Sequence, residues 1–302
     1  MHAGYKWAVS AIVIAVSSVL LIHSRTDSEE DKQYNSELNN HYAVYAIPMP
    51  ENLTFAGEAV PISDPDIFER VDRELHVNTY WQSNSLLIFK RANKYFPIIE
   101  PILEKNGVPD DFKYLAVIES GLQNVVSPAG AAGYWQFMKT SGKEFGLEVD
   151  AEVDERYHLE KATEAACQYL LQAKERFGTW TLAAASYNMG MGGLNKQLTR
   201  QKEDDYYDLL LNSETSRYVM RMIALKQIME SPKEYGFNFR EKDLYPLDSV
   251  KIITIDTAVL DFADFAQERN LSYKTLKYHN PWLRQSYLKN VSKKTYEIKL
   301  PI

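Results

Sequence analysis

A carboxylate stands at the end of an apolar segment, in the stretch ESG at residues 119–121. Phe112, Leu115, Ala116 and Glu119 recur at helical spacing, so they share one face of a predicted helix that ends at Glu119. Apolar surroundings disfavour the charged form of a carboxyl, and the negative end of the helix dipole repels it. Both effects predict a raised pKa for Glu119, which suits a general acid near neutral pH. A glutamate at the exposed lip of a buried helix is the alternative, and the helix alone leaves both interpretations open.

The segment after this helix carries groups suited to contact with a ligand. Gly130 and Gly133 permit backbone turns that other residues resist, and they allow a ligand to approach closely. They are followed by Tyr134, Trp135 and Gln136, which offer two ring faces and an amide. A glycine-rich surface loop with a buried tryptophan explains the same residues without a ligand.

Two further motifs place polar side chains at predicted helix ends. In SYNMG, Tyr187 and Asn188 stand at the end of a helix before a glycine. In RYV, Tyr218 stands one turn into the last helix of this region. A polar helix cap and a half-buried core tyrosine explain these residues equally well, so no single motif decides between structure and function.

The order of the four motifs resembles that of the lytic transglycosylases with a goose-lysozyme-like (SLT) catalytic domain. The likeness is closest to the membrane-bound murein transglycosylase D type and covers about residues 80–230. That family has Glu-Ser at a helix end, then Gly-x-x-Gln, Ala-Tyr-Asn and Tyr-Val. The matching stretches here are ESG at Glu119, GYWQFM at Gly133, SYNMG at Ser186 and RYV at Tyr218.

The resemblance implies cleavage of the β-1,4 bond between N-acetylmuramic acid and N-acetylglucosamine in peptidoglycan. Glu119 would protonate the glycosidic oxygen and then, as a carboxylate, take a proton from the C6 hydroxyl of muramic acid. That hydroxyl would attack C1 and leave a 1,6-anhydro product. Ordinary glycosidases need two carboxylates, whereas the matched motifs supply only Glu119. This difference fits a mechanism in which the N-acetyl group of the substrate stabilises the developing cation.

The resemblance also implies roles for the residues around Glu119. Tyr218 would orient Glu119 by hydrogen bonding, and Asn188 would contact the substrate near the cleavage site. Ser120 would support the N-acetyl group or the loop. The residues expected to bind substrate are Ser120, Trp135, Gln136, Tyr187 and Asn188.

Two other functions stay open at this point. A muramidase-type hydrolase of the same fold would need a second carboxylate to activate water. Asp150, Glu152 and Asp154 are the nearby candidates in the sequence, although nothing places them across the groove. A non-catalytic peptidoglycan-binding protein is the other alternative.

The predicted fold class is mainly α, with a lysozyme-like helical catalytic domain over residues 66–245. Its first helix follows Asp66, where Ile67, Val71, Leu75 and Asn78 form one stripe. The remaining predicted helices cover about 83–106 (kinked or split at Pro97 and Pro101), 110–119, 159–177, 180–188 and 214–230.

A small β-α-α-β unit is predicted over residues 246–302. The stretch VKIITI has the β-branched character of a strand, two short helical stretches follow, and YEIKLPI is again strand-like. This unit resembles a LysM module, a glycan-binding fold. The glycine expected before Asp256 is replaced by Ile255, so glycan binding and mere packing against the catalytic domain are both open.

The N-terminus predicts export from the cytoplasm. The run from Trp7 to Ile22 is uncharged and slightly short for a spanning helix, which needs about 20 residues. We interpret residues 1–24 as a signal or membrane anchor and 25–65 as a linker with an extended lead-in. The protein is therefore expected in the periplasm, anchored to the membrane by residues 7–22 or released by cleavage of a signal peptide.

The amino-acid composition limits the kinds of ligand and partner that can be expected for this protein. The net charge of −7 argues against nucleic acid, which needs clustered lysine and arginine. The single cysteine, Cys167, fits a packed thiol, and the six histidines show no metal-binding spacing, so we expect no metal and no cofactor. The expected partner is the peptidoglycan glycan strand, bound by a monomer.

Overall fold

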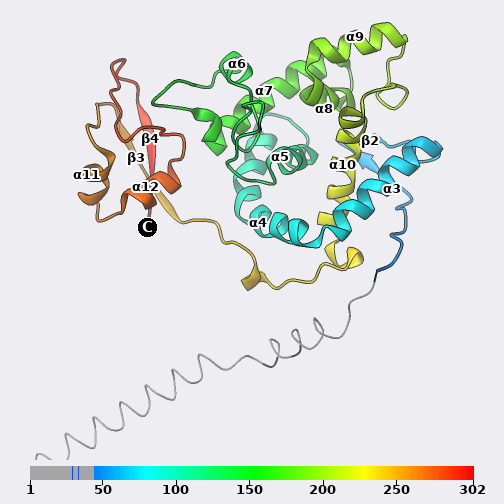
Figure 1. Cartoon of the computed structure of the whole chain (residues 1–302), viewed down its shortest axis with the longest axis horizontal. Coiled ribbons are helices and arrows are strands. Elements are labelled where there is room, and N and C mark those ends of the chain that lie inside the picture. The colour runs from blue at the N-terminus through cyan, green and yellow to red at the C-terminus, as the bar shows by residue number, and fades with distance from the viewer. Residues whose placement is uncertain (1–28, 30–32, 34–43) are drawn as a thin grey trace, which may run out of the picture. The chain divides into compact units, whose positions relative to one another are not determined.

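The computed structural model describes residues 29, 33 and 44–302 (Figure 1). The predicted anchor at 1–24 lies outside these residues, as does the first part of the predicted linker at 25–65, apart from residues 29 and 33. Among the described residues, no helix is long and apolar enough to cross a membrane. Residues 47–302 form one compact unit, which contains every element named below.

The larger part of this unit is helical. A small hairpin of β1 (Thr54–Phe55) and β2 (Glu58–Ala59) precedes it. The α-helices that follow are α3 (Pro65–Tyr80), α4 (Gln82–Lys105), α5 (Lys113–Ser120), α6 (Lys139–Glu144), α7 (Leu159–Phe177), α8 (Trp180–Met189), α9 (Met191–Gln201) and α10 (Ser213–Glu230). Short 3-10 helices cover Asp110–Phe112, Glu155–Tyr157, Pro232–Tyr235 and Glu241–Asp243.

Local signals explain most of these helix boundaries. Asp64 caps α3 by accepting hydrogen bonds from the next backbone amides, and Thr179 caps α8 in the same way. Gly178 ends α7 in the left-handed conformation, with φ of 83°. The predicted helix over 159–177 is confirmed.

Two predicted interruptions behave differently in the structure. The helix α4 runs without a break through Pro97 and Pro101. Each proline removes one backbone donor, but Ile99 and Leu103 are fully buried and hold this stretch against the core. In MGMGG, Gly190 ends α8, but the next helix, α9, begins directly at Met191. The chain therefore changes direction at Gly190 and continues as a helix.

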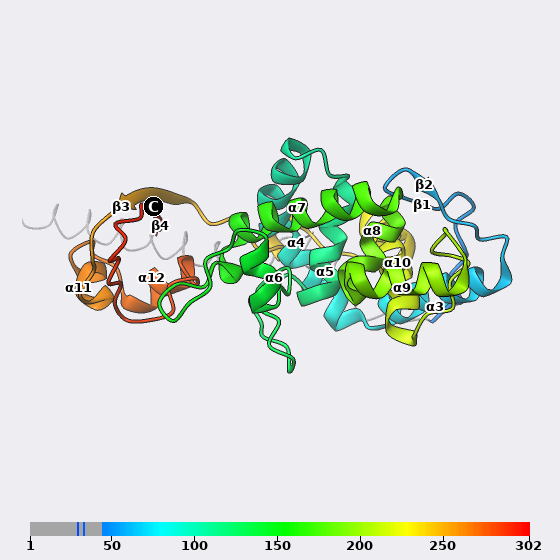
Figure 2. The same cartoon turned by 90° about the horizontal axis from the view of Figure 1, so that it is seen from above.

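The short helix α5 lies at the centre of the helical body (Figures 1 and 2). The helix α10 packs against α3, α5 and α8, and α4 packs against α5 and α7. Leu115, Ala116 and Val117 of α5 are buried, as the apolar sequence of this helix predicts. The polar end of α5, which carries Glu119, thus follows directly on residues that are buried in the helical core.

The C-terminal unit has the predicted β-α-α-β order. Strand β3 (Val250–Ile255) pairs antiparallel with β4 (Tyr296–Pro301), and α11 (Phe262–Gln267) and α12 (Tyr273–His279) lie between them in sequence. Its core is built on residues such as Phe262 and Ile298, both with no exposed surface. The fold class predicted from the sequence is therefore confirmed.

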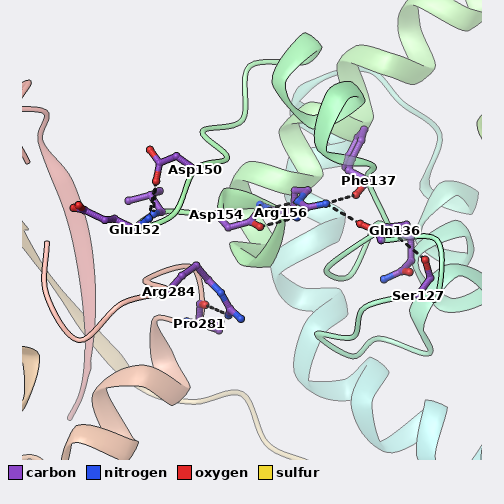
Figure 3. Close-up of polar contacts among 12 residues, drawn as sticks. Ser127, Gln136, Phe137, Asp150, Glu152, Asp154, Arg156, Pro281 and Arg284 are labelled. Carbon is purple, nitrogen blue, oxygen red and sulfur yellow. Dashed lines mark hydrogen bonds and ion pairs between the residues drawn. The ribbon is translucent and has the colours of Figure 1, made fainter.

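The C-terminal unit is docked on the helical part through the segment ahead of α7. Val153 forms a β-bridge with Leu283. The Asp154 amide donates to the Trp282 carbonyl at 2.9 Å, and the Arg284 amide donates to the Glu152 carbonyl at 2.7 Å. Figure 3 shows this junction, where the segment of Glu152 and Asp154 lies beside the turn that carries Arg284.

Candidate active site

Glu119 occupies the last turn of α5, directly before the residues that end the helix. Gly121 adopts the left-handed conformation with φ of 59° and closes the helix through its amide, which donates to the Val117 carbonyl. Glu119 itself is partly buried. The Tyr218 hydroxyl, from α10, donates a hydrogen bond to Glu119 Oε1.

The surroundings of Glu119 favour its protonated form. Burial raises its pKa most strongly, and the negative charge of Glu214 raises it further. The hydrogen bond from Tyr218 and the positive charge of Arg221 oppose these effects. The outcome is a pKa of about 7, well above the ordinary value of 4.5. A carboxyl with this pKa can hold a proton and also release it near neutral pH.

Two tyrosines enclose this carboxyl. Tyr218 is buried, with 4% of its surface exposed. Tyr187 is partly buried, and its hydroxyl donates to the Trp135 carbonyl at 2.9 Å. Burial, together with the charge of Glu119, raises the pKa of both phenols well above the usual value, so both hydroxyls remain donors. The structure thus brings Glu119, Tyr187 and Tyr218 together.

Ser120 faces the protein. Its buried hydroxyl lies 2.8 Å from the Tyr134 carbonyl and 3.0 Å from the Ala116 carbonyl. It also accepts from the Gln123 amide at 3.3 Å. These contacts tie the end of α5 to the loop and engage the hydroxyl within the protein.

The expectation that Trp135 lines a sugar groove is corrected. This side chain has no exposed surface, and its indole Nε1 donates to Thr163 Oγ1 of α7 at 2.8 Å. A ring enclosed on all sides cannot pack on a sugar. Trp135 instead anchors the loop, as in the structural alternative considered from the sequence.

Gln136 is partly exposed and has a constrained backbone, with φ of 49°. Its Nε2 donates to the carbonyls of Gly133 at 2.7 Å and Val125 at 3.0 Å. Both donor hydrogens of the amide are therefore engaged within the loop. The side-chain oxygen is the atom that Gln136 can offer to a ligand.

Asn188 lies at the end of α8 between two residues of α10. Its Oδ1 accepts from Thr215 Oγ1 at 2.7 Å, and its Nδ2 donates to Glu214 Oε1 at 3.3 Å. Glu214 is exposed, while Thr215 is buried. The sequence did not single out Glu214 or Thr215, because an acid after Asn212 at a helix start resembles ordinary capping.

A buried ion-pair group stands next to this site. Glu74 of α3 is 1% exposed and accepts from Arg217 Nε at 2.6 Å. Arg221 Nε lies 3.7 Å from the other oxygen of Glu74. Arg217 and Arg221 flank Tyr218 along α10, and the charge of Arg221 reaches Glu119. Glu74 could not be recognised from the sequence, since nothing local marks a glutamate of α3 as a partner of α10.

The candidate second carboxylates face other partners. Asp154 pairs with the Arg156 guanidinium at 2.7 Å, and Asp150 accepts from the amides of Glu152 and Val153 at 2.8 Å. Glu152 accepts from the Lys289 amide at 2.7 Å. Figure 3 shows all three carboxylates at the junction with the C-terminal unit. Within the described part of the chain, no cluster of acidic, histidine or cysteine side chains could hold a metal ion.

The rate of any reaction that needs protonated Glu119 should depend on pH around its pKa. We expect kcat/KM to fall as pH rises through about 7. Tyr218→Phe removes the hydrogen bond that lowers this pKa, so the alkaline limb should move to higher pH while the rate falls. A pH–rate profile of both proteins tests this, and an unmoved limb would contradict the role of the bond.

Two stretches of the chain match models of known protein families. Residues 96–210 match the model of the transglycosylase SLT domain. The chain carries an SLT domain. Residues 251–302 match the soluble lytic transglycosylase C-terminal LysM-like domain. The SLT match contains Glu119 and Asn188 but ends before Tyr218.

Full-length relatives extend the likeness beyond the SLT domain. The membrane-bound lytic murein transglycosylase D of Escherichia coli K12 is 28% identical over 244 residues, and the protein of the same name from strain O6:H1 gives the same values. The alignment covers 78% of this chain and 52% of each relative, so the chain spans about half the length of the curated relatives it matches.

Two solved structures also resemble this chain in part. The 70 kDa soluble lytic transglycosylase of Escherichia coli is 21% identical, with a TM-score of 0.40 over 46% of this chain and 24% of that one. An inactive mutant of the lytic transglycosylase Slt from Pseudomonas aeruginosa is 19% identical, with a TM-score of 0.36 over 51% and 27%.

Proposed function

We propose that the protein is a lytic transglycosylase that cleaves the bond between N-acetylmuramic acid and N-acetylglucosamine in peptidoglycan. The observation that carries the proposal is the Glu119 carboxyl, held at a pKa of about 7 by burial and hydrogen-bonded to Tyr218. Its position within an SLT domain supports peptidoglycan as the substrate. The matched relatives are named as murein transglycosylases.

In the proposed reaction, Glu119 acts twice. It first gives its proton to the glycosidic oxygen, so that the bond from this oxygen to C1 breaks. The N-acetyl carbonyl of the substrate stabilises the positive charge that develops at C1. The Glu119 carboxylate then takes the proton of the C6 hydroxyl, whose oxygen attacks C1 and closes the 1,6-anhydro ring. The proton is back on Glu119, and no water is consumed.

The surrounding residues have distinct parts in this proposal. Tyr218 orients the carboxyl through its hydrogen bond and remains protonated throughout, since its pKa is far above neutral. Asn188, fixed by Thr215 and Glu214, presents its amide near the cleavage site. Gln136 and Tyr187 lie at the wall of the glycan groove, and Ser120 supports the loop through Tyr134.

A hydrolase of the same fold is the second candidate, and one residue gives it a physical basis. Glu214 is exposed and close enough to Glu119 for its charge to raise the Glu119 pKa. A hydrolase could use such a carboxylate to activate water. However, Glu214 accepts a hydrogen bond from Asn188 Nδ2, which favours a role in which Glu214 positions Asn188 for the lytic reaction.

Glu214→Gln separates the two candidates. We expect the variant to keep releasing 1,6-anhydro muropeptides from purified sacculi, measured by mass spectrometry. Because a negative charge is lost, the pKa of Glu119 should fall and the alkaline limb of the rate profile should move to lower pH. Loss of turnover by a factor of about 100 or more would instead identify Glu214 as a base. Reducing-end muramic acid as the product would rule out the lytic reaction.

The location follows from the same proposal. Peptidoglycan lies outside the cytoplasmic membrane, and the matched relative is named as membrane-bound. We therefore place the protein in the periplasm, with the apolar run from Trp7 to Ile22 as its anchor or export signal. Fractionation of cells that express the full chain tests this placement.

A further inference from the structure

A cavity of about 840 Å³ lies between the SLT domain and the C-terminal unit. Its walls come from α4, the residues after α5, the segment ahead of α7, the connection into β3 and the end of α12. Cavities of this size at domain junctions commonly bind small ligands. Glu119, Tyr187 and Tyr218 are not among its lining residues, but Leu122 and Gln123, which follow α5, are.

Ion pairs and hydrogen bonds between opposite walls of the cavity hold these walls in place. Lys94 of α4 pairs with Asp248 of the connecting segment at 2.5 Å and donates to the Tyr278 hydroxyl of α12 at 2.8 Å. On the other side, Lys299 of β4 pairs with Glu160 at the start of α7. These contacts join both parts of the molecule, so the cavity is a fixed feature of the junction.

The two acidic groups that line the cavity are already neutralised. Burial raises the pKa of Glu160, but the hydrogen bond from His158 and the charge of Lys299 outweigh it and lower the pKa to about 2. Asp248 is paired with Lys94. Each of these carboxylates therefore already has a cationic partner within the protein. Neither is available to neutralise another cationic side chain of the cavity wall.

The cavity wall also contains Arg91, whose positive charge is not paired with a carboxylate in the described part of the chain. Among the described residues, no carboxylate lies within 4 Å of its guanidinium, whose Nη1 donates to the Gly121 carbonyl at 3.1 Å. A guanidinium has five donor hydrogens, and its planar fork matches a carboxylate. In a chain of net charge −7, an unpaired arginine in a largely apolar cavity favours an anionic ligand.

We propose that this cavity binds a carboxylate of the short peptide stems that peptidoglycan strands carry, while the strand itself lies at Glu119; this inference rests on the proposed function. The carboxylate meets Arg91, and the aliphatic part of the peptide lies against apolar walls such as Ile98 and Leu122. Arg91 contacts the carbonyl of Gly121, which ends the helix of Glu119. The cavity thus adjoins the residues that end the helix of Glu119, and in this proposal one substrate occupies both places.

The test compares strands that keep their stems with strands from which an amidase has removed them, using the full chain. We expect Arg91→Gln to lower the ratio of kcat/KM for stem-bearing over stem-free strands about tenfold, as expected for a charged hydrogen bond. Leu247, half exposed at the cavity, allows a second variant: Leu247→Glu should lower the ratio by repulsion, while the neutral Leu247→Gln should not. Leu210→Glu is the matched control, since Leu210 is exposed outside the cavity.

Two outcomes would overturn the inference. One is a ratio that stays within twofold of the parent in both Arg91→Gln and Leu247→Glu. The other is an equal loss on both substrates in Arg91→Gln, which would restrict Arg91 to supporting Gly121. Calorimetric binding of an isolated stem peptide to Glu119→Gln, with and without Arg91→Gln, decides the inference without turnover. If the parent protein cleaves neither substrate, the proposed function fails while this binding result still stands.

Discussion

Replacing Glu119 by glutamine should reduce cleavage of purified sacculi about a thousandfold, the range over which general acid catalysis operates. Glutamine keeps the shape of the side chain but cannot deliver a proton to the glycosidic oxygen. Release of muropeptides, followed by chromatography, measures the loss. Binding of the variant to sacculi should persist, because the rest of the groove is unchanged. Unaltered turnover would remove Glu119 from the mechanism.

The same variant should be more stable than the parent at alkaline pH. The pKa of Glu119 is about 7 in the folded protein and near its ordinary value of 4.5 in the unfolded chain. Below 4.5 the group is protonated in both states, so it costs nothing. Between about pH 4.5 and 7 the unfolded chain releases its proton while the folded state keeps it, so the folded state loses stability across this window, and above 7 the loss is complete at about 3 kcal/mol. Denaturant unfolding at pH 4 and pH 8 should show an advantage of Glu119→Gln only at pH 8.

Replacing Gly133 by alanine should cost at least about 3 kcal/mol of folding free energy. Its φ is +83°, and an added Cβ would lie 1.8 Å from the Arg156 carbonyl oxygen. That backbone cannot easily move, because the Arg156 side chain is tied to Asp154 and to the carbonyls of Gly130 and Phe137 (Figure 3). Such a clash with fixed backbone belongs to the most damaging class of substitutions.

Gly130→Ala provides the control for this effect. Gly130 has a similar φ of +89°, but nothing lies within 4 Å of an added Cβ. It should therefore pay only the left-handed penalty of about 1–2 kcal/mol. Thermal unfolding of both variants separates the two contributions. Equal losses in both would show that the loop yields around Gly133.

The sequence was most informative where a signal is local. The caps and glycines around α7 and α8 depend on residues within a turn of one another, so the helix bounds could be read closely. Glu119 at the end of an apolar helix was recognisable for the same reason. Its raised pKa depends mainly on burial, which the apolar faces of α5 predict.

Features that depend on packing between distant segments could not be read. Trp135 looked like a ligand contact because its motif lies in a glycine-rich loop, but Thr163 of α7 completes its burial. Glu214 acts on Glu119 only because α10 packs against α5. The cavity with Arg91 exists only once the C-terminal unit is docked. In each case the decisive neighbour is far away in the chain.

The docking of the C-terminal unit also bears on how such a chain can evolve. Val153 and Tyr157 belong to the same apolar cluster as Phe262 and Leu276, and the Val153–Leu283 bridge adds backbone pairing between the two parts. A unit joined in this way is not an independent module on a flexible linker. Exchange for an unrelated glycan-binding module would require matching changes in the segment around Val153, so the two parts are constrained to change together.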